Sequence, residues 1–285
     1  MDFLIGHLKG CFYDLRAEIP ATSSRVRRSL FLFSCLLVCH CRANYREWQS
    51  PACTITQPDL TILQFSDTHV RNDNDAEWLH AQLVAAIAVN KPDVLVHTGD
   101  ITLDGEDSEW LAFTGGLKDL NPSPLYVWGN HDMALKQSRF AKGGLSNYHD
   151  IGNYRLILID TAWEGLFTGS YTSVPESEFP ALKAMAETKK KILLFAHHPL
   201  GKDAPHFRLR NADQVLGLFA DAEVVGVFTG HFHGAYLAPE KNLLFAGVAP
   251  LARHQRNHTW SQTKGYRLIE LQNGCLRTRF VKVET

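Results

Sequence analysis

The chain has 285 residues, of which 45% are hydrophobic, so it is long enough for one large domain or two small ones with a sizeable core. Its 29 Lys and Arg residues nearly balance its 30 Asp and Glu residues, giving a formal net charge of -1. This balance lacks the basic field of a non-specific nucleic-acid binder, so a nucleic acid polymer is not favoured as a partner.

The N-terminal region resembles a targeting segment. Residues 25–43 read "RVRRSLFLFSCLLVCHCRA", with a basic start, an apolar run over 30–38 and a polar end. This is the layout of a secretory signal, and the apolar run is shorter than the roughly 20 residues that span a bilayer. A start codon placed too far upstream is the alternative. We expect residues 1–55 to be signal-like or disordered and residues 56–285 to form one domain. If the segment is a secretory signal, the protein is secreted or periplasmic. If the start codon is placed too far upstream, the protein is cytoplasmic.

Cysteines are concentrated at the N-terminus. Five of the six precede residue 55, and only Cys275 lies in the expected domain. We therefore expect that domain to contain no internal disulfide. The closely spaced Cys39 and Cys41 do not match the spacing of a zinc site.

Apolar runs of strand length alternate with amphipathic stretches from residue 59 onward. In the first half we predict strands over 60–66, 93–100 and 123–130, and helices over 76–90, 106–120 and 132–142. Later strands are predicted over 154–160, 191–196, 223–230, 242–248, 266–271 and 276–283, with helices over 176–190 and 211–221. The helix-connected strands are expected to be parallel, and the last two antiparallel around a turn at 272–274. The pattern indicates a mixed α/β domain.

Side chains that bind metals follow five of these apolar strands. They are Asp67 and His69; Asp100; Asn130, His131 and Asp132; His197 and His198; and His231 and His233. Residues at the carboxyl ends of strands in an open α/β sheet can converge on one spot. Each group alone has an ordinary explanation, such as a carboxylate that caps the next helix, but five in order do not. His80 and His97 lie inside a helix and a strand, and we interpret them as structural.

These side chains suit a pair of divalent cations. Two such ions about 3.5–4 Å apart repel each other unless a carboxylate lies between them, and Asp100 is the natural bridge. Imidazole, carboxylate and amide ligands without a thiolate favour Mn²⁺, Fe, Zn²⁺, Co²⁺ or Ni²⁺. We expect two divalent metal ions as cofactors.

The five motifs in order, D-x-H, GD, GNHD, HHP and GHxH, resemble the calcineurin-like metallophosphoesterases over residues 60–280. The resemblance implies a four-layer α/β/β/α sandwich with two mixed sheets. It implies that one metal is held by Asp67, His69, Asp100 and His233, and the other by Asp100, Asn130, His197 and His231. The choice of His197 over His198 follows the family pattern, in which the ligand precedes the proline by two positions.

The same resemblance implies a hydrolytic mechanism. His131 would act on the leaving oxygen, with Asp132 behind it to orient the imidazole, and a metal-bridging hydroxide would attack phosphorus. The stretches "TILQFSDTHV", "AHHPLGKDAPHFRLRNADQVLGLF" and "TKGYRLIEL" are most similar to the bacterial cyclic-nucleotide phosphodiesterase branch. We therefore expect a phosphodiesterase for which 3',5'-cyclic nucleotides are candidate substrates.

Other functions stay open. A glycerophosphodiester or lipid-type phosphodiesterase and a phosphomonoesterase are the enzymatic alternatives. A purple acid phosphatase would need a tyrosine shortly after the GD motif, where this chain has Ile101 to Asp104. An inactive interaction scaffold would be expected to have lost ligands or His131, and none is lost here. Contacts between the substrate and His206, Arg208 or Arg210 are conceivable, but a surface helix capped by Asn211 explains this stretch equally, so substrate-binding residues remain unassigned.

Overall fold

The computed structural model describes residues 46–51, 53–140, 144–164, 169–202, 207–240, 243–255, 257–258 and 261–284. The signal-like run over 25–43 lies outside these residues. The strands are β1 (Glu47–Gln49), β2 (Leu60–Phe65), β3 (Val94–His97), β4 (Pro124–Tyr126), β5 (Asn147–Ile151), β6 (Tyr154–Ile159), β7 (Lys191–Ala196), β8 (Val224–Thr229), β9 (Tyr236–Glu240), β10 (Leu243–Gly247), β11 (Lys264–Gln272) and β12 (Cys275–Val283). The α-helices are α2 (Asp73–Asn90), α3 (Asp107–Leu117), α4 (Met133–Leu135), α5 (Phe179–Ala186) and α6 (Ala212–Gly217).

The strands form two mixed sheets of six strands each. The first has the order β1-β12-β11-β2-β3-β4, and the second β5-β6-β7-β8-β10-β9. Strands β2, β3 and β4 run parallel, as do β6, β7 and β8. Strands β11 and β12 form the predicted antiparallel hairpin, whose turn uses positive φ at Asn273 and Gly274.

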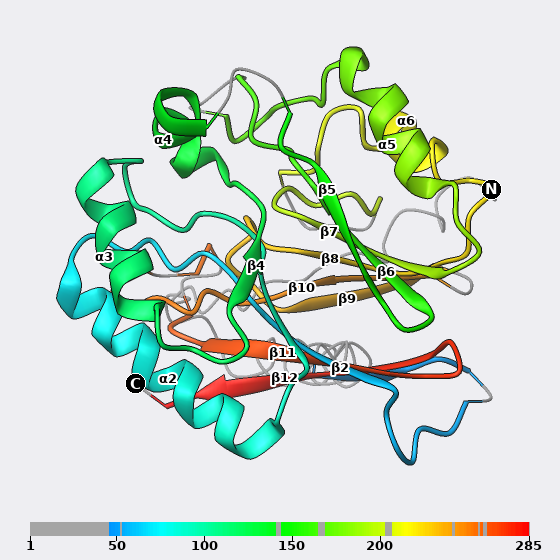
Figure 1. The fold of residues 1–285 in the computed structure, drawn as a ribbon, viewed down its shortest axis with the longest axis horizontal. Coiled ribbons are helices and arrows are strands. Elements are labelled where there is room, and N and C mark those ends of the chain that lie inside the picture. The colour runs from blue at the N-terminus through cyan, green and yellow to red at the C-terminus, as the bar shows by residue number, and fades with distance from the viewer. Residues whose placement is uncertain are drawn as a thin grey trace, which may run out of the picture.

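The two sheets pack face to face, with helices on their outer faces (Figure 1). The layer between the sheets is built from apolar side chains such as Ile62, Val96 and Phe195. A second core lies under α2 and α3, and a third under α5 and α6. The central strands are buried on both faces, which is why their sequences are continuous apolar runs rather than alternating ones. The four-layer α/β/β/α sandwich is therefore confirmed.

Two features cross the expected domain boundary at residue 56. Cys53, which precedes that boundary, forms a disulfide with Cys275, with a Cα–Cα distance of 5.8 Å, whereas residues 56–285 by themselves contain no second cysteine. Strand β1, which lies before the expected domain boundary at residue 56, pairs antiparallel with β12. The five-residue strands β5 and β9 were also missed. Strand β5 is almost wholly exposed and β9 contains Pro239, so neither has the apolar run that marks a buried strand.

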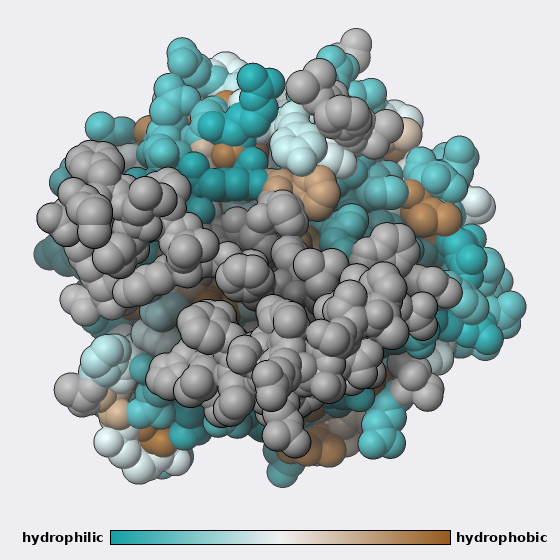
Figure 2. Space-filling model, turned by 180° about the vertical axis from the view of Figure 1, so that it is seen from behind, coloured by the Kyte–Doolittle hydropathy of each residue, from teal (hydrophilic) through white to brown (hydrophobic). Residues whose placement is uncertain are grey.

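No helix in the described part of the chain is long and apolar enough to cross a bilayer. Figure 2 shows the back of the molecule, where the coloured side chains are mostly hydrophilic and hydrophobic residues form separate small spots.

Candidate metal centre

The loops after five strands bring the predicted residues together between the two sheets. Asp67 and His69 follow β2, Asp100 follows β3, Asn130 follows β4, His197 follows β7, and His231 and His233 follow β8. All seven side chains are buried. Burying this many polar groups is costly unless they are paired or bind a metal.

The backbone of these loops is held in an unusual conformation. Five of the seven residues have φ between 43° and 62°, in the left-handed region that side chains other than glycine rarely adopt: Asp67, His69, Asp100, His231 and His233. Such residues persist only where the surrounding structure imposes them, and they cluster at functional sites. The chain thus strains its backbone at the positions that the motifs singled out.

Glycines allow the loops to approach one another. A Cβ at Gly129 would lie 2.1 Å from the backbone nitrogen of Asp100, and one at Gly230 would lie 2.0 Å from Ser66 Oγ. Only glycine fits at these two positions. The backbone of the neighbouring loops therefore passes close to the ligand groups at these two glycines.

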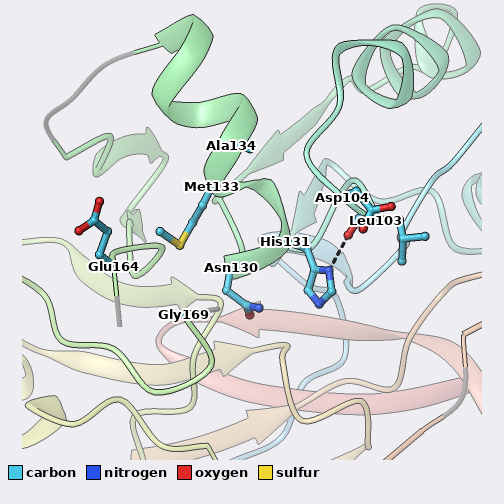
Figure 3. A pocket seen from close by; sticks show the side chains of 8 residues that line it. All are labelled: Leu103, Asp104, Asn130, His131, Met133, Ala134, Glu164 and Gly169. Atoms are coloured by element: carbon cyan, nitrogen blue, oxygen red, sulfur yellow. Dashed lines mark hydrogen bonds between the residues drawn. The ribbon is translucent and has the colours of Figure 1, made fainter. Parts of the chain in front are cut away.

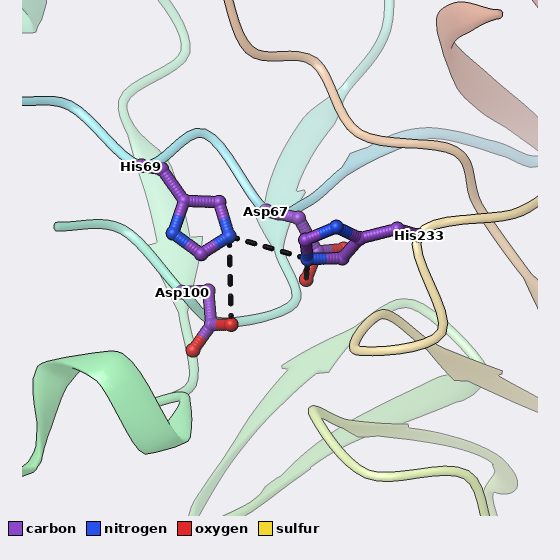
Figure 4. Close-up of side chains that lie close together, drawn as sticks. All are labelled: Asp67, His69, Asp100 and His233. Atoms are coloured by element: carbon purple, nitrogen blue, oxygen red, sulfur yellow. Dashed lines mark hydrogen bonds and ion pairs between the residues drawn. The ribbon is translucent and has the colours of Figure 1, made fainter. Parts of the chain in front are cut away.

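The first group of side chains consists of Asp67, His69, Asp100 and His233, whose ligand atoms all lie within 4.8 Å of one another (Figure 4). His69 Nε2 is 3.2 Å from His233 Nε2 and 3.6 Å from Asp100 Oδ2. His233 Nε2 lies 3.4 Å from Asp67 Oδ1. Asp67 Oδ2 is buried without a hydrogen-bond partner among the described residues. Four potential ligands therefore face a common point.

The second group consists of Asp100, His197 and His231, with Asn130 beside them. His197 Nδ1 donates to Thr98 O at 2.9 Å, and His231 Nε2 donates to Ser170 O at 3.2 Å. These bonds occupy His197 Nδ1 and His231 Nε2, and the other two ring nitrogens, His197 Nε2 and His231 Nδ1, face each other at 3.0 Å.

The spacing of these atoms fits bound cations. Two ring nitrogens 3.0 Å apart repel each other unless a proton or a metal lies between them. Ligands at about 2.1 Å from an ion are separated by about 3.0 Å in an octahedron and about 3.4 Å in a tetrahedron, which matches the separations above. The donors are nitrogen and oxygen without sulfur, as expected for divalent transition metals.

Asp100 links the two groups. Its Oδ2 faces His69, and its Oδ1 lies 3.3 Å from His197 Nε2. Each carboxylate oxygen thus faces a different group, an arrangement that allows Asp100 to bridge two metals. Although burial raises it, the nearby His197 and His69 bring the pKa of Asp100 well below its usual range. Burial lowers the pKa of His197, but Asp100 more than offsets this and raises it to about 9.

The two adjacent histidines 197 and 198 point in different directions. His197 joins the second group, whereas His198 Nδ1 lies 2.9 Å from Thr161 Oγ1 and its Nε2 lies 3.0 Å from Gly169 O. Burial lowers the pKa of His198 to about 3, so it is neutral, accepting from the hydroxyl and donating to the carbonyl. The structure places His197 among the candidate ligands and gives His198 a structural role. His97 is likewise structural, since its Nε2 meets Thr68 Oγ1.

His131 is oriented by a group that the sequence did not reveal. Its ring contacts His69 at 4.7 Å between centroids, and its Nδ1 donates to the carbonyl of Leu103. Any residue supplies such a carbonyl, so no side-chain signal could have identified it. With Nδ1 occupied, Nε2 is the ring nitrogen that can meet a substrate.

The carboxylate of Asp132 makes its hydrogen bonds to neighbouring loops, whereas the His131 ring is held by Leu103. The Asp132 carboxylate accepts from the backbone N–H groups of Ile101, Thr102 and Gly129 and from the Thr102 hydroxyl. Burial and the nearby Asp100 raise the pKa of Asp132 to about 6, while these hydrogen bonds favour the charged form. Asp132 therefore joins the loop after β3 to the loop after β4, and it positions both.

A cavity of about 570 Å³ opens beside the centre. Asn130 and His131 line it together with four apolar or small residues and two exposed carboxylates (Figure 3): Leu103, Asp104, Met133, Ala134, Glu164 and Gly169. No Lys or Arg is among these described lining residues. Of the substrate contacts considered above, Arg208 donates to Leu200 O and pairs with Asp213, and His206 lies outside the described residues.

Similarities to known proteins fit this arrangement. A family model described as calcineurin-like phosphoesterase matches residues 60–235. The chain is 25% identical over 199 residues to the 3',5'-cyclic adenosine monophosphate phosphodiesterase CpdA of Haemophilus influenzae, covering 62% of this chain and 71% of that protein. It is 28% identical over 199 residues to the probable glycerophosphodiester phosphodiesterase GpdQ of Arcobacter nitrofigilis, covering 61% and 72%. The solved structure of GAP50, the anchor in the inner membrane complex of Plasmodium, has the same fold, with a TM-score of 0.55 at 17% identity and coverage of 79% and 85%.

Proposed function

The chain belongs to the calcineurin-like phosphoesterase family, and from this premise we propose that it cleaves phosphodiester bonds at a dinuclear metal centre. It is a metal-dependent phosphoesterase. The finer assignments, two metals and a diester substrate, rest on the two ligand groups that share Asp100 and on the cavity beside His131.

The charge of the cavity is the observation that favours a diester over a monoester. Near neutral pH a phosphomonoester carries close to two negative charges, because its second pKa is about 6, whereas a diester carries one. Asp104 and Glu164 add negative charge to the cavity wall, and the described lining offers no cationic side chain to hold a second anionic oxygen. These carboxylates repel a doubly charged monoester more strongly than a singly charged diester, so the diester is the better match.

The chain's own residues would then act as follows. Asp67, His69, Asp100, Asn130, His197, His231 and His233 would hold the two cations. When bound, the cations supply activation of the attacking water and neutralise charge on the phosphoryl oxygens. His131, held at Nδ1 by Leu103, presents Nε2 to the departing oxygen and can deliver a proton there. Asp132 keeps the loop that carries Asn130 and His131 in place.

The test is hydrolysis of bis(p-nitrophenyl) phosphate against p-nitrophenyl phosphate, with the full-length protein stripped of metal and reconstituted with Mn²⁺. We expect Mn²⁺-dependent turnover that favours the diester, and none for Asp100→Asn. A preference for the monoester would support the phosphomonoesterase alternative. No turnover of either ester by a folded, metal-loaded sample would support the interaction scaffold instead.

A glycerophosphodiester substrate is the second candidate, because a relative at 28% identity carries that name. The metal centre alone does not separate it from a nucleotide substrate, since both present the same phosphodiester group.

A further inference from the structure

Three aromatic side chains outside the ligand set adjoin the metal centre: Tyr171, Phe207 and His258, here called the aromatic rim. The Phe207 ring lies 5.2 Å from the ring of His231, 5.1 Å from that of His258 and 5.4 Å from that of Tyr171. The ring of His258 stacks on that of His233 at 4.7 Å, with an interplanar angle of 28°. The rim thus touches both histidines of the loop after β8.

Phe207 is held in a strained backbone conformation. Its φ is 59°, and a bulky aromatic residue in this region is a genuine outlier that the surrounding structure must impose. Its neighbour Arg208 fixes the following turn through Leu200 O and Asp213. Within the described residues, the other positive-φ positions outside the ligand set are Lys91, after helix α2, Asn273, in a hairpin turn, and glycines. The strain at Phe207 lies directly beside the candidate ligand His231 and points to a functional position.

The rim is accessible to a ligand. Tyr171 exposes 36% of its surface, His258 is exposed and Phe207 is half-buried. Tyr171 also follows Ser170, whose carbonyl accepts from His231 Nε2, so the rim is tied to the centre through the backbone as well. A row of aromatic rings next to a phosphoester site offers flat faces to the organic part of the substrate.

We propose that the aromatic rim stacks against the base of a nucleoside phosphodiester, which makes Phe207 and Tyr171 specificity-determining residues. This rests on the proposed function and names its substrate class. A nucleobase has a π-face that stacks on aromatic rings, whereas the glycerol or ethanolamine arm of a glycerophosphodiester has none. The rim therefore favours the nucleotide over the glycerol diester.

The competing explanation is that the rings only support His231 and His233. Substitution separates the two. Phe207→Leu removes the aromatic face but keeps an apolar side chain with a Cβ, so the strain at this position is unchanged. Tyr171→Leu does the same at the more exposed position. Tyr148→Leu is the matched control, because Tyr148 is an exposed aromatic residue on the edge strand β5.

The experiment measures kcat and KM of the full-length Mn²⁺-loaded protein with cyclic AMP and with glycerophosphoethanolamine. We expect Phe207→Leu and Tyr171→Leu each to raise KM for cyclic AMP, the former roughly tenfold as a lost base–aromatic stack implies. In both variants the KM for glycerophosphoethanolamine and the metal content should be unchanged. The control Tyr148→Leu should have the wild-type KM for both substrates, and Phe207→Tyr should have the wild-type KM for cyclic AMP. Equal losses on both substrates, or loss of metal, would show that the rings only support the ligands and would overturn the proposal.

Binding of adenosine separates this proposal from the proposed function. Adenosine has the base but no phosphate, and saturation-transfer NMR detects its contact with the protein without any turnover. Adenosine binding that is lost in Phe207→Leu would support the rim even if no diester were hydrolysed. Diester hydrolysis without adenosine binding, and with equal use of both substrates, would uphold the proposed function and refute the rim.

Discussion

Single residues in the centre differ in what their loss should do. His131 contacts His69 but belongs to neither ligand group, whereas Asp100 presents one oxygen to each. We predict that His131→Ala keeps both metals and lowers kcat by roughly 100- to 10,000-fold, the usual contribution of general acid–base catalysis. Asp100→Asn should lose metal and all activity.

Metal content by mass spectrometry alongside kinetics checks this pair. His149→Ala, on the exposed strand β5, is the matched histidine control and should behave as wild type. Equal metal loss in His131→Ala and Asp100→Asn would contradict the catalytic role given to His131.

We expect the main effect of Asp132 to be on the stability of the fold rather than on the chemical step. Its two oxygens accept from three backbone N–H groups and one hydroxyl, so an asparagine would turn an NH₂ group towards donors. We predict that Asp132→Asn lowers the free energy of unfolding of the metal-free protein by about 1–3 kcal/mol. Urea denaturation of the metal-free form checks this, with exposed Asp119→Asn as the control. An unchanged midpoint together with lost activity would favour an orienting role instead.

At the scale of elements, the loops after the parallel strands carry the site and the antiparallel additions brace the sheet. Strand β1 pairs with β12, and the disulfide from Cys53 to Cys275 fixes the same edge. Closing a long loop restricts the unfolded chain, and removing such a bond typically costs about 2–5 kcal/mol.

We therefore predict that reducing agent lowers the melting temperature of the wild type. The Cys53→Ser/Cys275→Ser double variant should melt at the lower temperature with or without reducing agent. Calorimetry of the four samples checks this, and identical wild-type curves in both conditions would show that the bond is not formed. Activity should change little, because no candidate ligand lies in β1 or β12.

Elements with a long apolar run could be predicted from the sequence, whereas short elements without such a run could not. The buried strands β2, β3, β7 and β8 are apolar on both faces, so their positions followed from the sequence. Strand β1 is only three residues long and owes its place to pairing with β12. Such pairing between segments more than 200 residues apart has no local signature. The Cys53–Cys275 bond was missed for the same reason.

For the whole molecule, the order of motifs predicted which residues would meet but not how each is held. The seven candidate ligands converge as expected, because the ends of parallel strands share one edge of each sheet and the sheets face each other. The tautomers of His197 and His231 depend on backbone carbonyls of Thr98 and Ser170, which residue types do not encode. The strained φ values are likewise a property of the assembled fold.

The disulfide closes the chain from residue 53 to residue 275 into a covalent ring, and every candidate ligand lies inside it. A protease that cuts one surface loop within the ring would leave two polypeptides joined by the Cys53–Cys275 bond rather than release a fragment. The halves of the centre contributed by residues 67–130 and 197–233 would stay tethered at the Cys53–Cys275 edge. A nicked protein should therefore migrate as one species without reducing agent and as two with it, and it can retain its metal centre after the cut.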